Sequence, residues 1–258
     1  MSEPVALEVD HLSKRYGKSM VLRAITFRVA VGEAVAILGP NGSGKTTLLR
    51  CLAGLLRPNH GRIRVFGYDL HQEELKAKQA LAFVPDTPSP FQELTVFEHL
   101  KFVALACGLD QADFKSKAQR LLELYGLDQH QALPFQLSRG MAQKLAICCA
   151  LIRPWKLMLL DEPTANLDRQ AFDILKATLA EAAGQGKSVL LSTHQAALAE
   201  EVCTRFLILS GGEIKFSGSA RELRRAAGVG PEVDLGVAYR ALLTEPQQYE
   251  DDNDSGEE

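Results

Sequence analysis

The chain has 258 residues, of which 46% are hydrophobic and 24% are charged, an ordinary composition for a globular protein with a buried core. Its longest apolar run covers residues 145–152, whereas a membrane span needs about 20 apolar residues, and its first residues lack the basic start and apolar stretch of a secretory signal; we expect neither. The formal net charge of -3 gives no case for nucleic-acid binding, and we expect none.

The acidic residues gather at the C-terminal end. No Lys or Arg follows Arg240, whereas six acidic side chains fall within residues 250–258. Without that segment, 29 basic residues face 26 acidic ones, so the rest of the chain carries a formal charge of +3. Residues 246–258 are polar and almost without apolar side chains, which predicts disorder and a solvating role, with tethering of a partner as the alternative.

The five cysteines show no spacing typical of a metal or redox motif. They are Cys51, Cys107, Cys148, Cys149 and Cys203, and no two of them form a Cys-x-x-Cys pair. Cys148 and Cys149 are neighbours within an apolar run that has helical character. This usage predicts reduced, buried thiols in a cytosolic protein.

The first part of the chain predicts strands around a glycine-rich loop. Alternating polar and apolar residues at 6–9 and 25–29 are typical of half-buried antiparallel strands. Residues 31–33 predict a turn, and the unbroken apolar run at 34–38 predicts a strand covered on both faces, as in a parallel sheet. A helix is predicted at 48–56, after the loop.

The second part predicts further strands and a block of helices. The apolar spacings from Leu94 to Ile152 predict only helices, the first of them capped by Thr95. The other predicted elements are a helix at 73–80, strands at 81–84, 157–160, 188–192 and 206–209, and a helix within 230–244. Strands that alternate with helices favour an α/β fold with a parallel sheet, into which the helical block of about 60 residues is inserted.

Residues Gly39–Thr46 match the phosphate-loop pattern GxxxxGK[ST] in full, between a predicted strand and a predicted helix. The glycines let backbone N–H groups turn toward phosphate oxygens at a helix N-terminus. Lys45 adds a positive charge at the β- and γ-phosphates, and the Thr46 hydroxyl is a ligand for Mg²⁺. The loop therefore predicts nucleotide binding with Mg²⁺.

Two later strand ends carry polar residues that suit the chemistry of a bound nucleotide. The apolar run at 157–160 closes on Asp161, which can hold Mg²⁺, and on Glu162, which can position or deprotonate an attacking water. His194 follows the apolar strand at 188–192, where a polar residue can sense the γ-phosphate. Each signal is weak alone, but beside the phosphate loop they predict hydrolysis.

Two further features are ambiguous from the residues alone. Ser138 precedes a predicted helix at 142–152 and is a good N-cap, so plain capping explains it at least as well as anion binding does. Tyr16 lies just before a predicted strand, and its ring suits either stacking on a nucleobase or packing against the protein.

Together these segments resemble the ATP-binding subunit of ABC transporters over about residues 5–245. The resemblance rests on the phosphate loop, on the sequence LSRGM at 137–141, on LLDEPTANLD at 159–168 and on His194. It implies a P-loop NTPase core with a parallel sheet, an N-terminal antiparallel β subdomain and an inserted all-helical subdomain. It also implies an ATPase that binds ATP and Mg²⁺.

The resemblance further implies a head-to-tail dimer in which each ATP lies between the phosphate loop of one subunit and the signature helix of the other. Ser138, Arg139 and Gly140 then bind the γ-phosphate across the dimer, and residues 165–168 form a loop that communicates between subunits. The expected ATP-binding residues are Tyr16, which stacks on adenine, Gly39, Pro40, Asn41, Gly42, Ser43, Gly44, Lys45, Thr46, Thr47, Ser138, Arg139, Gly140 and Asp168. The expected catalytic residues are Lys45, Glu162 and His194, and the expected magnesium ligands are Thr46, Asp161 and Asp86.

Three positions depart from the family pattern. The signature reads LSRGM where LSGGQ is commonest, so Arg139 and Met141 replace Gly and Gln, and Arg139 adds charge near the phosphates. Asp86 stands where the family usually carries a Gln that contacts magnesium and links to the membrane partner, which alters how this loop senses the metal and the γ-phosphate. Residues 165–166 read Ala-Asn where Ser-Gly is usual, a mild change.

The segment that follows Asp86 resembles the bacterial exporter branch, in which single-domain ATPases pair with separate permease subunits. We therefore expect a peripheral protein on the cytoplasmic face of the cell membrane that drives export. We expect a nucleotide-binding domain at 1–229 with its helical subdomain at about 88–154, a C-terminal helix at 230–245 and a disordered tail at 246–258.

Three alternatives arise from the same motifs. A soluble ABC-type ATPase that acts on DNA or the ribosome usually has long coiled coils or two ATPase domains, and this sequence shows neither. A non-hydrolysing regulatory module is disfavoured by the presence of Lys45, Asp161, Glu162 and His194, although Asp86 leaves some room for it. A small-molecule kinase gives no reason for the signature helix.

Overall fold

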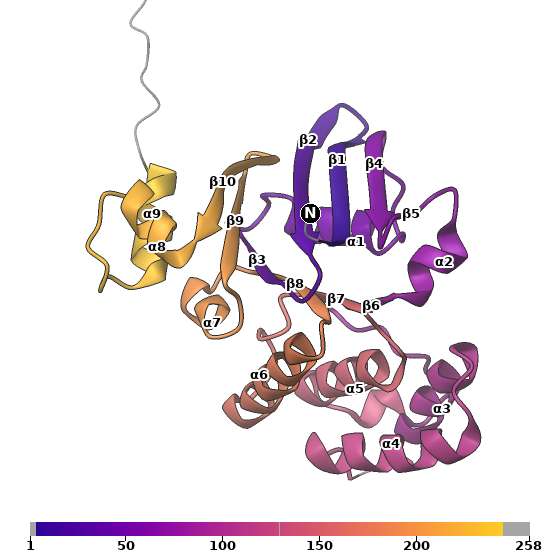
Figure 1. Ribbon diagram of the computed structural model, residues 1–258. Coiled ribbons are helices and arrows are strands. Elements are labelled where there is room, and N and C mark those ends of the chain that lie inside the picture. Colours follow the sequence, from indigo (N-terminus) through magenta and orange to yellow (C-terminus); the bar gives the residue numbers. More distant parts are fainter. Residues whose placement is uncertain (1–3, 129, 245–258) are drawn as a thin grey trace, which may run out of the picture.

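The computed structural model describes residues 4–128 and 130–244, and Figure 1 shows them as two β-sheets accompanied by helices. The strands are β1 (Val5–Tyr16), β2 (Ser19–Ala30), β3 (Ala34–Leu38), β4 (His60–Val65), β5 (Tyr68–Asp69), β6 (Leu81–Val84), β7 (Leu157–Asp161), β8 (Ser188–Thr193), β9 (Arg205–Ser210) and β10 (Glu213–Ser219). The helices are α1 (Lys45–Leu52), α2 (Glu74–Gln79), α3 (Val96–Ala106), α4 (Gln111–Leu124), the 3₁₀ turn η1 (Pro134–Gln136), α5 (Arg139–Ile152), α6 (Arg169–Gly184), α7 (Ala196–Glu200), α8 (Ala220–Ala226) and α9 (Leu235–Thr244).

Four antiparallel strands, in the order β2-β1-β4-β5, form the expected N-terminal β subdomain. Leu7 and Val9 of β1 point into the core in strict alternation, but the next buried apolar residue is Leu12, because the pairing with β2 shifts register between Val9 and Leu12. Such shifts hide the true length of β1 from a period-two pattern. As a result Tyr16, predicted to precede a strand, is the last residue of β1.

The second sheet has six strands in the order β10-β9-β3-β8-β7-β6, of which β10 is antiparallel and the others are parallel. Every residue of β7 and β8 is buried, as their apolar runs predict, since both faces of this sheet are covered. The carboxyl ends of β3, β6, β7 and β8 meet at one edge. The segments that begin at residues 39, 85, 162 and 194 are therefore neighbours there.

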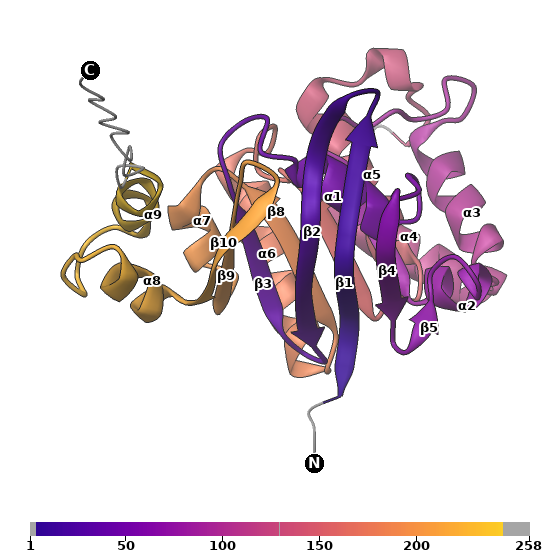
Figure 2. The same cartoon turned by 90° about the horizontal axis from the view of Figure 1, so that it is seen from above.

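Two hydrophobic clusters hold these layers together. One lies between the two sheets and encloses α1, whose Leu48, Leu49 and Leu52 are fully buried. The other covers the opposite face of the parallel sheet and extends through α3–α6 to α8 and α9. Figure 2 shows β1, β2 and β4 lying over α1 and the parallel strands. Since α1 is enclosed on both sides, the glycine-rich loop that leads into it has a fixed position.

The helical insert comprises α3, α4, η1 and α5 and lies to one side of the parallel sheet (Figure 1). Thr95 caps α3 in a reciprocal capping box with Glu98, which confirms the predicted helix start. Ser138 caps α5, as predicted, by accepting a hydrogen bond of 3.2 Å from the backbone N–H of Met141.

Two helix boundaries differ from the predicted ones. Helix α5 begins at Arg139, directly after its cap, and not at residue 142. Helix α1 covers Lys45–Leu52 and not 48–56, because the phosphate loop passes straight into its first turn and Gly54, with a φ of 68°, ends it. Apolar spacing locates the middle of a helix, whereas the turn residues at its ends decide its length.

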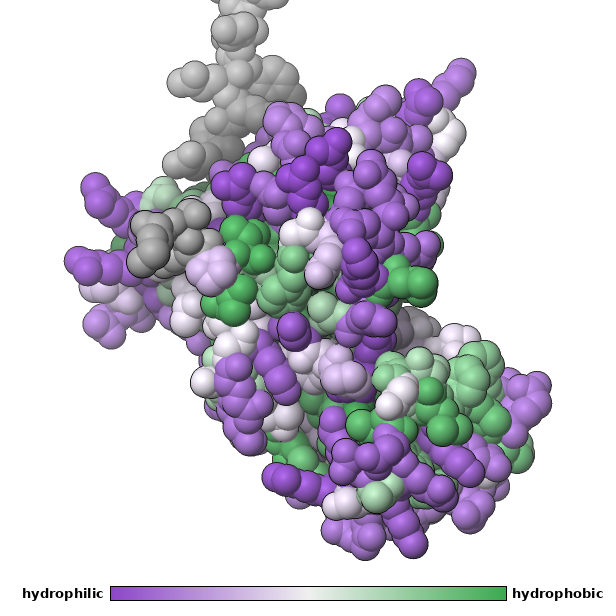
Figure 3. All heavy atoms as spheres, turned by 45° about the vertical axis from the view of Figure 1, so that its right-hand side comes forward, coloured by the Kyte–Doolittle hydropathy of each residue, from purple (hydrophilic) through white to green (hydrophobic). Residues whose placement is uncertain are grey.

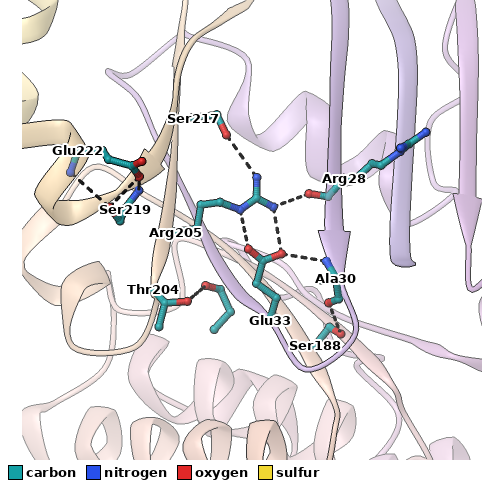
Figure 4. A network of polar contacts seen from close by, with 10 residues as sticks. Arg28, Ala30, Glu33, Ser188, Thr204, Arg205, Ser217, Ser219 and Glu222 are labelled. Carbon is teal, nitrogen blue, oxygen red and sulfur yellow. Dashed lines mark hydrogen bonds and ion pairs between the residues drawn. The ribbon is translucent and has the colours of Figure 1, made fainter. Parts of the chain in front are cut away.

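Arg205, the first residue of β9, joins the two sheets at the end remote from the glycine-rich loop (Figure 4). Its guanidinium donates two hydrogen bonds to the carboxylate of Glu33, one from Nε and one of 3.0 Å from Nη2. It also donates to the backbone carbonyl of Arg28 in β2. A further bond of 3.3 Å reaches the hydroxyl of Ser217 in β10. Side chains of β9, β10 and the turn at Glu33, and the backbone of β2, are thereby held together.

The remaining expectations about the chain as a whole have mixed outcomes. The five cysteines are free thiols, and Cys51, Cys148 and Cys203 are buried as predicted, whereas Cys107 and Cys149 are partly exposed. Within 4–128 and 130–244, no helix has the length and apolar character that crossing a bilayer requires. The predicted disordered segment 246–258 lies outside the described residues.

Candidate functional site

The glycine-rich loop between β3 and α1 borders a hollow of about 420 Å³ at the carboxyl edge of the parallel sheet. Its lining consists of Val21, Asn41, Gly42, Gly44, Lys45, Thr46, Thr47, Asp86 and Glu162. Eight of these nine residues were singled out from the sequence; Val21 of β2 was not. The structure therefore brings the phosphate-loop residues together with Asp86 and Glu162, which lie 40 and 116 positions beyond Thr46 in the chain.

Backbone geometry explains two glycines of the loop. A Cβ on Gly39 would approach the carbonyl oxygen of Leu209 and the hydroxyl of Ser43 to 2.5 Å each. Gly44 has a φ of 105°, and a Cβ there would lie 2.9 Å from Leu22. The loop thus runs against β2 and β9 so closely that side chains at these two positions are excluded. The hydroxyl of Ser43 is buried without a hydrogen-bond partner, as suits a group that faces a ligand.

Lys45 is held inside the loop that it belongs to. Its Nζ donates hydrogen bonds to the carbonyls of Gly39, at 2.8 Å, and Pro40, at 3.3 Å, and lies 3.3 Å from Oε1 of Glu162. The side chain is only 7% exposed. Carbonyl and carboxylate oxygens around the enclosed Nζ supply the hydrogen-bond partners that its burial requires.

Asp161 ends β7 as a nearly inaccessible carboxylate. It accepts a hydrogen bond of 2.7 Å from the hydroxyl of Ser192 on the neighbouring strand. Burial raises the pKa of Asp161, the hydrogen bonds from Ser192 and Thr46 lower it, and the charges of Asp86 and Glu162 raise it further. A nearby cation would relieve this accumulation of negative charge, which is the electrostatic condition for holding a metal ion.

The oxygen atoms at this edge fit Mg²⁺. The Thr46 hydroxyl contacts the carboxylate of Asp161, and Asp86 lines the same hollow, so the available donors are the hard oxygens that Mg²⁺ prefers. In the described part of the chain no three His, Cys, Asp or Glu side chains are grouped closely enough to hold a metal by themselves. This suits an ion that completes its shell with phosphate oxygens and water.

Glu162 follows Asp161 in an uncommon backbone conformation, with a φ of 44°. Its N–H donates to the carbonyl of Ser192 at 3.0 Å, which anchors the turn to β8. Its carboxylate bridges two groups: Oε1 faces Lys45, and Oε2 lies 3.0 Å from Nδ1 of His194 and accepts a bond of 3.3 Å from the His194 N–H. Lys45, Glu162 and His194 thus form one continuous chain of contacts.

The signature segment lies elsewhere in this chain. Ser138, Arg139 and Gly140 begin α5 and do not line the hollow at the phosphate loop. A Cβ on Gly140 would lie 2.9 Å from the carbonyl oxygen of Asn166, so the first turn of α5 packs directly on the loop at 165–168. Within one subunit, the structure therefore joins the signature segment to that loop and not to the phosphate site.

An ion pair strengthens this contact. Asp168 caps α6 by accepting a bond of 2.8 Å from the N–H of Ala171, and its carboxylate also lies 2.8 Å from Nζ of Lys144 in α5. The hydrogen bond from Lys144 and then that from Ala171 lower the pKa of Asp168. Asp168, expected to contact ATP, is in this subunit a helix cap that ties α6 to α5.

Tyr16 is also separate from the hollow. Its ring is half exposed at the end of β1, with the ammonium of Lys14 located 5.3 Å from the ring centroid. One face of the ring therefore already meets a cation. A base that stacks on Tyr16 must use the other face or displace Lys14.

Sequence reasoning did not assign two side chains that support the site. Ser192 binds Asp161, and Gln143 of α5 is fully buried with its Nε2 located 3.4 Å from the carbonyl of Pro85, just before Asp86. Each is a polar residue at a position where the local pattern calls for an apolar one. That break in the pattern is the signal that identifies both of them.

Comparisons with known proteins agree with this geometry. A family model described as ABC transporter matches residues 22–165. The ABC-type transporter ATP-binding protein EcsA of Bacillus subtilis is 34% identical over 245 residues, which cover 95% of this chain and 99% of that protein. The Nod factor export ATP-binding protein I of Rhizobium etli is 33% identical over 219 residues, which cover 84% of this chain and 69% of that protein.

Solved structures are similar over the same range. The structure of an ATP-binding subunit of an ABC transporter has a TM-score of 0.86 at 36% identity, and the match covers 92% of this chain and 99% of the other. A dimeric ATP-binding cassette in a post-hydrolysis state, bound to ADP and Pi, has a TM-score of 0.74 at 25% identity and covers 83% of this chain and 98% of its own.

Proposed function

The chain belongs to the ABC transporter family of ATP-binding ATPases, and from that premise we propose that it powers export through a separate membrane permease by ATP-dependent dimerisation. The proposal rests on the contacts that join Lys45 to Glu162 and Glu162 to His194 beside the phosphate loop. They bring together a cation, a carboxylate that can activate water and an imidazole that can sense the γ-phosphate. The steps below derive from these residues.

ATP binds with its phosphates in the loop. The backbone N–H groups of residues 39 and 41–47 and the ammonium of Lys45 receive the β- and γ-phosphates, and the adenine stacks on the free face of Tyr16. Thr46, Asp161 and Asp86 would hold Mg²⁺, which would supply positive charge to the phosphates. Phosphate oxygens then replace the carboxylate of Glu162 at Lys45, so nucleotide binding releases Glu162 toward water.

Hydrolysis depends on how Glu162 is held once it is released. The backbone N–H and Nδ1 of His194 keep the carboxylate of Glu162 oriented from the side of β8, while the turn at Glu162 is fixed by Ser192. Glu162 then accepts a proton from the attacking water, or orients it, and His194 contacts the γ-phosphate. The strained backbone at Glu162 is consistent with a residue positioned for function.

A second copy of this chain completes the site. Ser138, Arg139 and Gly140 do not line the hollow at their own phosphate loop, and the N-terminus of α5 attracts anions. In a head-to-tail dimer they bind the γ-phosphate held by the partner subunit, with Arg139 adding a positive charge. The contacts of Gly140 with Asn166 and of Lys144 with Asp168 carry this event to the loop at 165–168 in the same subunit.

The permease contact is best placed at the junction of the Asp86 loop with α3 and α5. A hollow of about 260 Å³ opens there, lined in part by Pro85, Pro88, Phe91 and His99. Phe91 is 56% exposed, stacks on His99 and meets Phe102 edge to face, and Figure 3 shows hydrophobic side chains gathering on the face of the helical insert in that view. Gln143 of α5 binds the carbonyl of Pro85, which connects this surface to Asp86.

The larger organisation follows from the same proposal. We propose that residues 1–229 act as the nucleotide-binding domain, with the helical subdomain at about 88–154. The C-terminal helix expected at 230–245 is present as α9, which begins later, at Leu235, and is described as far as Thr244. Because the protein would drive a membrane permease with ATP, we propose that it lies on the cytoplasmic face of the membrane. The name of the Rhizobium etli relative, a Nod factor export protein, supports the direction of transport.

The direct test is Glu162→Gln. We expect ATP hydrolysis to fall about a hundredfold or more, because the amide accepts no proton, while ATP binding and ATP-dependent dimerisation persist. Phosphate release and light scattering in the presence of ATP and Mg²⁺ measure the two effects. Glu123→Gln, at an exposed position of α4, is the matched control. Wild-type turnover in Glu162→Gln would contradict the assigned role, and loss of dimerisation would contradict the proposed cycle.

A further inference from the structure

A groove separate from the phosphate site runs between α4 of the helical insert and α6 of the core. Its volume is about 410 Å³, within the range of small-molecule sites. The lining consists of Lys117, Arg120, Leu121, Leu124, Leu151, Trp155, Ile174, Ala177, Thr178, Glu181, Ala182, Gln185 and Lys187. The groove shares no residue with the hollow at the phosphate loop, and Figure 1 shows α4, α5 and α6 on the side of the sheet away from β1 and β2.

The body of the groove is apolar. Leu121, Leu151 and Ala182 are buried beneath it, while Leu124 is 42% exposed along its side. Trp155 lies in the connection between α5 and β7 with 4% of its surface accessible, so one part of the indole forms the floor. An apolar ligand that covers these side chains removes them from water, which lowers the free energy and favours binding.

Two lysines of the lining lie near one another. Nζ of Lys187 lies 4.7 Å from the centroid of the Trp155 ring, and Nζ of Lys117 donates a bond of 2.8 Å to the carbonyl of Ile152, three residues before Trp155. Burial, and then the charge of Lys187, lower the pKa of Lys117, so the two ammoniums repel one another across a partly dry space. Arg120 stands one turn further along α4.

These cations lack carboxylate partners. Within the part of the chain that the structure describes, Lys117, Lys187 and Arg120 make no ion pair. Glu181 is the carboxylate that lines the groove, and Asp113 acts on Lys117 electrostatically without contact. Three positive groups against one negative lining residue leave an unbalanced charge beside apolar surface, which an anion would neutralise.

We propose that this groove binds a single-chain anionic amphiphile, with its carboxylate between Lys117 and Lys187 and its apolar body along Leu121 and Leu124. Lys117 and Lys187 lie near one another, and Leu121 and Leu124 follow Lys117 one and two turns further along α4, which suits a ligand with a charged head and an apolar tail. A concave site of this volume receives a free molecule, whereas a bilayer would need a convex or flat face and an acidic helix would need cations along its whole length. A bound amphiphile contacts both the insert and the core.

The test uses laurate below its micelle-forming concentration, without nucleotide. Trp155 is the single tryptophan of the chain, so its emission reports on the groove directly, and calorimetry gives an independent affinity. We expect a saturable change with laurate, weaker binding of dodecanol and none of dodecyltrimethylammonium. Lys117→Gln and Lys187→Gln are each expected to weaken laurate binding about tenfold, the loss of one charge-assisted contact. Lys115→Gln, on the exposed side of the same helix, is expected to change nothing.

A second pair of variants tests the apolar part. Ala177→Glu places a carboxylate in the lining and is expected to abolish laurate binding, whereas Ala180→Glu, one turn away on α6 and outside the groove, leaves it intact. Circular dichroism confirms that each variant is folded. Equal binding of the cationic amphiphile, equal losses in Lys115→Gln, or binding of anionic vesicles or an acidic peptide without free laurate would overturn the proposal. Because ATP is absent throughout, such a failure leaves the proposed transport function untouched.

Discussion

The parallel sheet carries a polar network at each end, and the two networks balance charge differently. Where β3 and β9 begin, the guanidinium of Arg205 meets the carboxylate of Glu33, a backbone carbonyl and the hydroxyl of Ser217. Where β7 ends, Lys45 faces Glu162, while Asp161 and Asp86 make no ion pair within the described residues. One end is neutral and saturated with hydrogen bonds, and the other holds an excess of negative charge.

This difference separates stability from function within one sheet. Removing one partner of a matched pair such as Arg205 and Glu33 lowers the stability of the fold strongly, because the other partner is left partly buried with an uncompensated charge. The other end combines the left-handed backbone of Glu162 with an unpartnered hydroxyl at Ser43 and a carboxylate whose pKa is raised by burial. Such features cost stability, and a bound nucleotide and cation relieve them.

The largest expected effect comes from Asp161→Asn. The neutral amide weakens the hold on Mg²⁺, so ATP hydrolysis is expected to fall about a thousandfold. Without nucleotide, the free energy of unfolding is expected to stay the same or rise, because the amide removes a buried charge and still accepts the bond from Ser192. Phosphate release and urea unfolding at pH 7 measure the two quantities.

Asp173→Asn is the control for Asp161→Asn, since Asp173 is an exposed carboxylate on α6 that pairs with Arg169. It is expected to leave hydrolysis unchanged. A loss of several kcal/mol of stability in Asp161→Asn would show that Asp161 holds the fold together, and the contrast between the two ends of the sheet would then be wrong.

The opposite end is probed by Arg205→Ala, for which we expect the reverse pattern. The free energy of unfolding falls by about 2 kcal/mol, since Glu33 loses its partner and the β9 edge loses its link to β2, while kcat at low temperature is preserved. Arg205→Lys keeps the charge but not the forked geometry and is expected to recover about half of the loss. A fall in kcat without a fall in stability would place Arg205 in the catalytic cycle.

The sequence predicts those parts of the site that depend on local backbone geometry, and it does not predict the contacts between distant elements. The phosphate loop lies within nine consecutive residues, and its glycines and Lys45 have positions that follow from local backbone geometry alone. Asp161 and Glu162 were assigned because a strand end fixes where they point. The partnerships of Ser192 with Asp161 and of Gln143 with Pro85 depend on strand order and helix packing, which no local pattern contains.

The limits of β1 and α5 show the same rule on a smaller scale. Register shifts within β1 interrupt its alternation, so the strand reaches Tyr16 unseen. Gly140 in the first turn of α5 disfavours a helix by propensity, yet the cap at Ser138 and the packing on Asn166 start the helix at Arg139. Tertiary contacts determine where a strand or helix begins and ends wherever the local preference of the sequence is weak.

The smallest expected effect concerns Asp168, a residue that has both a stabilising contact and an expected part in communication between subunits. Asp168→Asn keeps a good helix cap but loses the ion pair with Lys144, which is worth a few tenths of a kcal/mol at this exposed position. Because the folded-state pKa of Asp168 is lowered, its stabilisation is present above the unfolded pKa of about 4 and is lost as pH falls through the lower folded value. The stability difference between wild type and Asp168→Asn should therefore be constant from pH 7 to pH 5 and should vanish in more acid solution, as measured by urea midpoints.

Asp110→Asn, which changes the similar cap of α4 where no ion pair is present among the described residues, should show a smaller difference at pH 7. If Asp168→Asn also lowers ATP hydrolysis while Asp110→Asn does not, the ion pair between α5 and α6 belongs with the catalytic end of the sheet and not with the stabilising end.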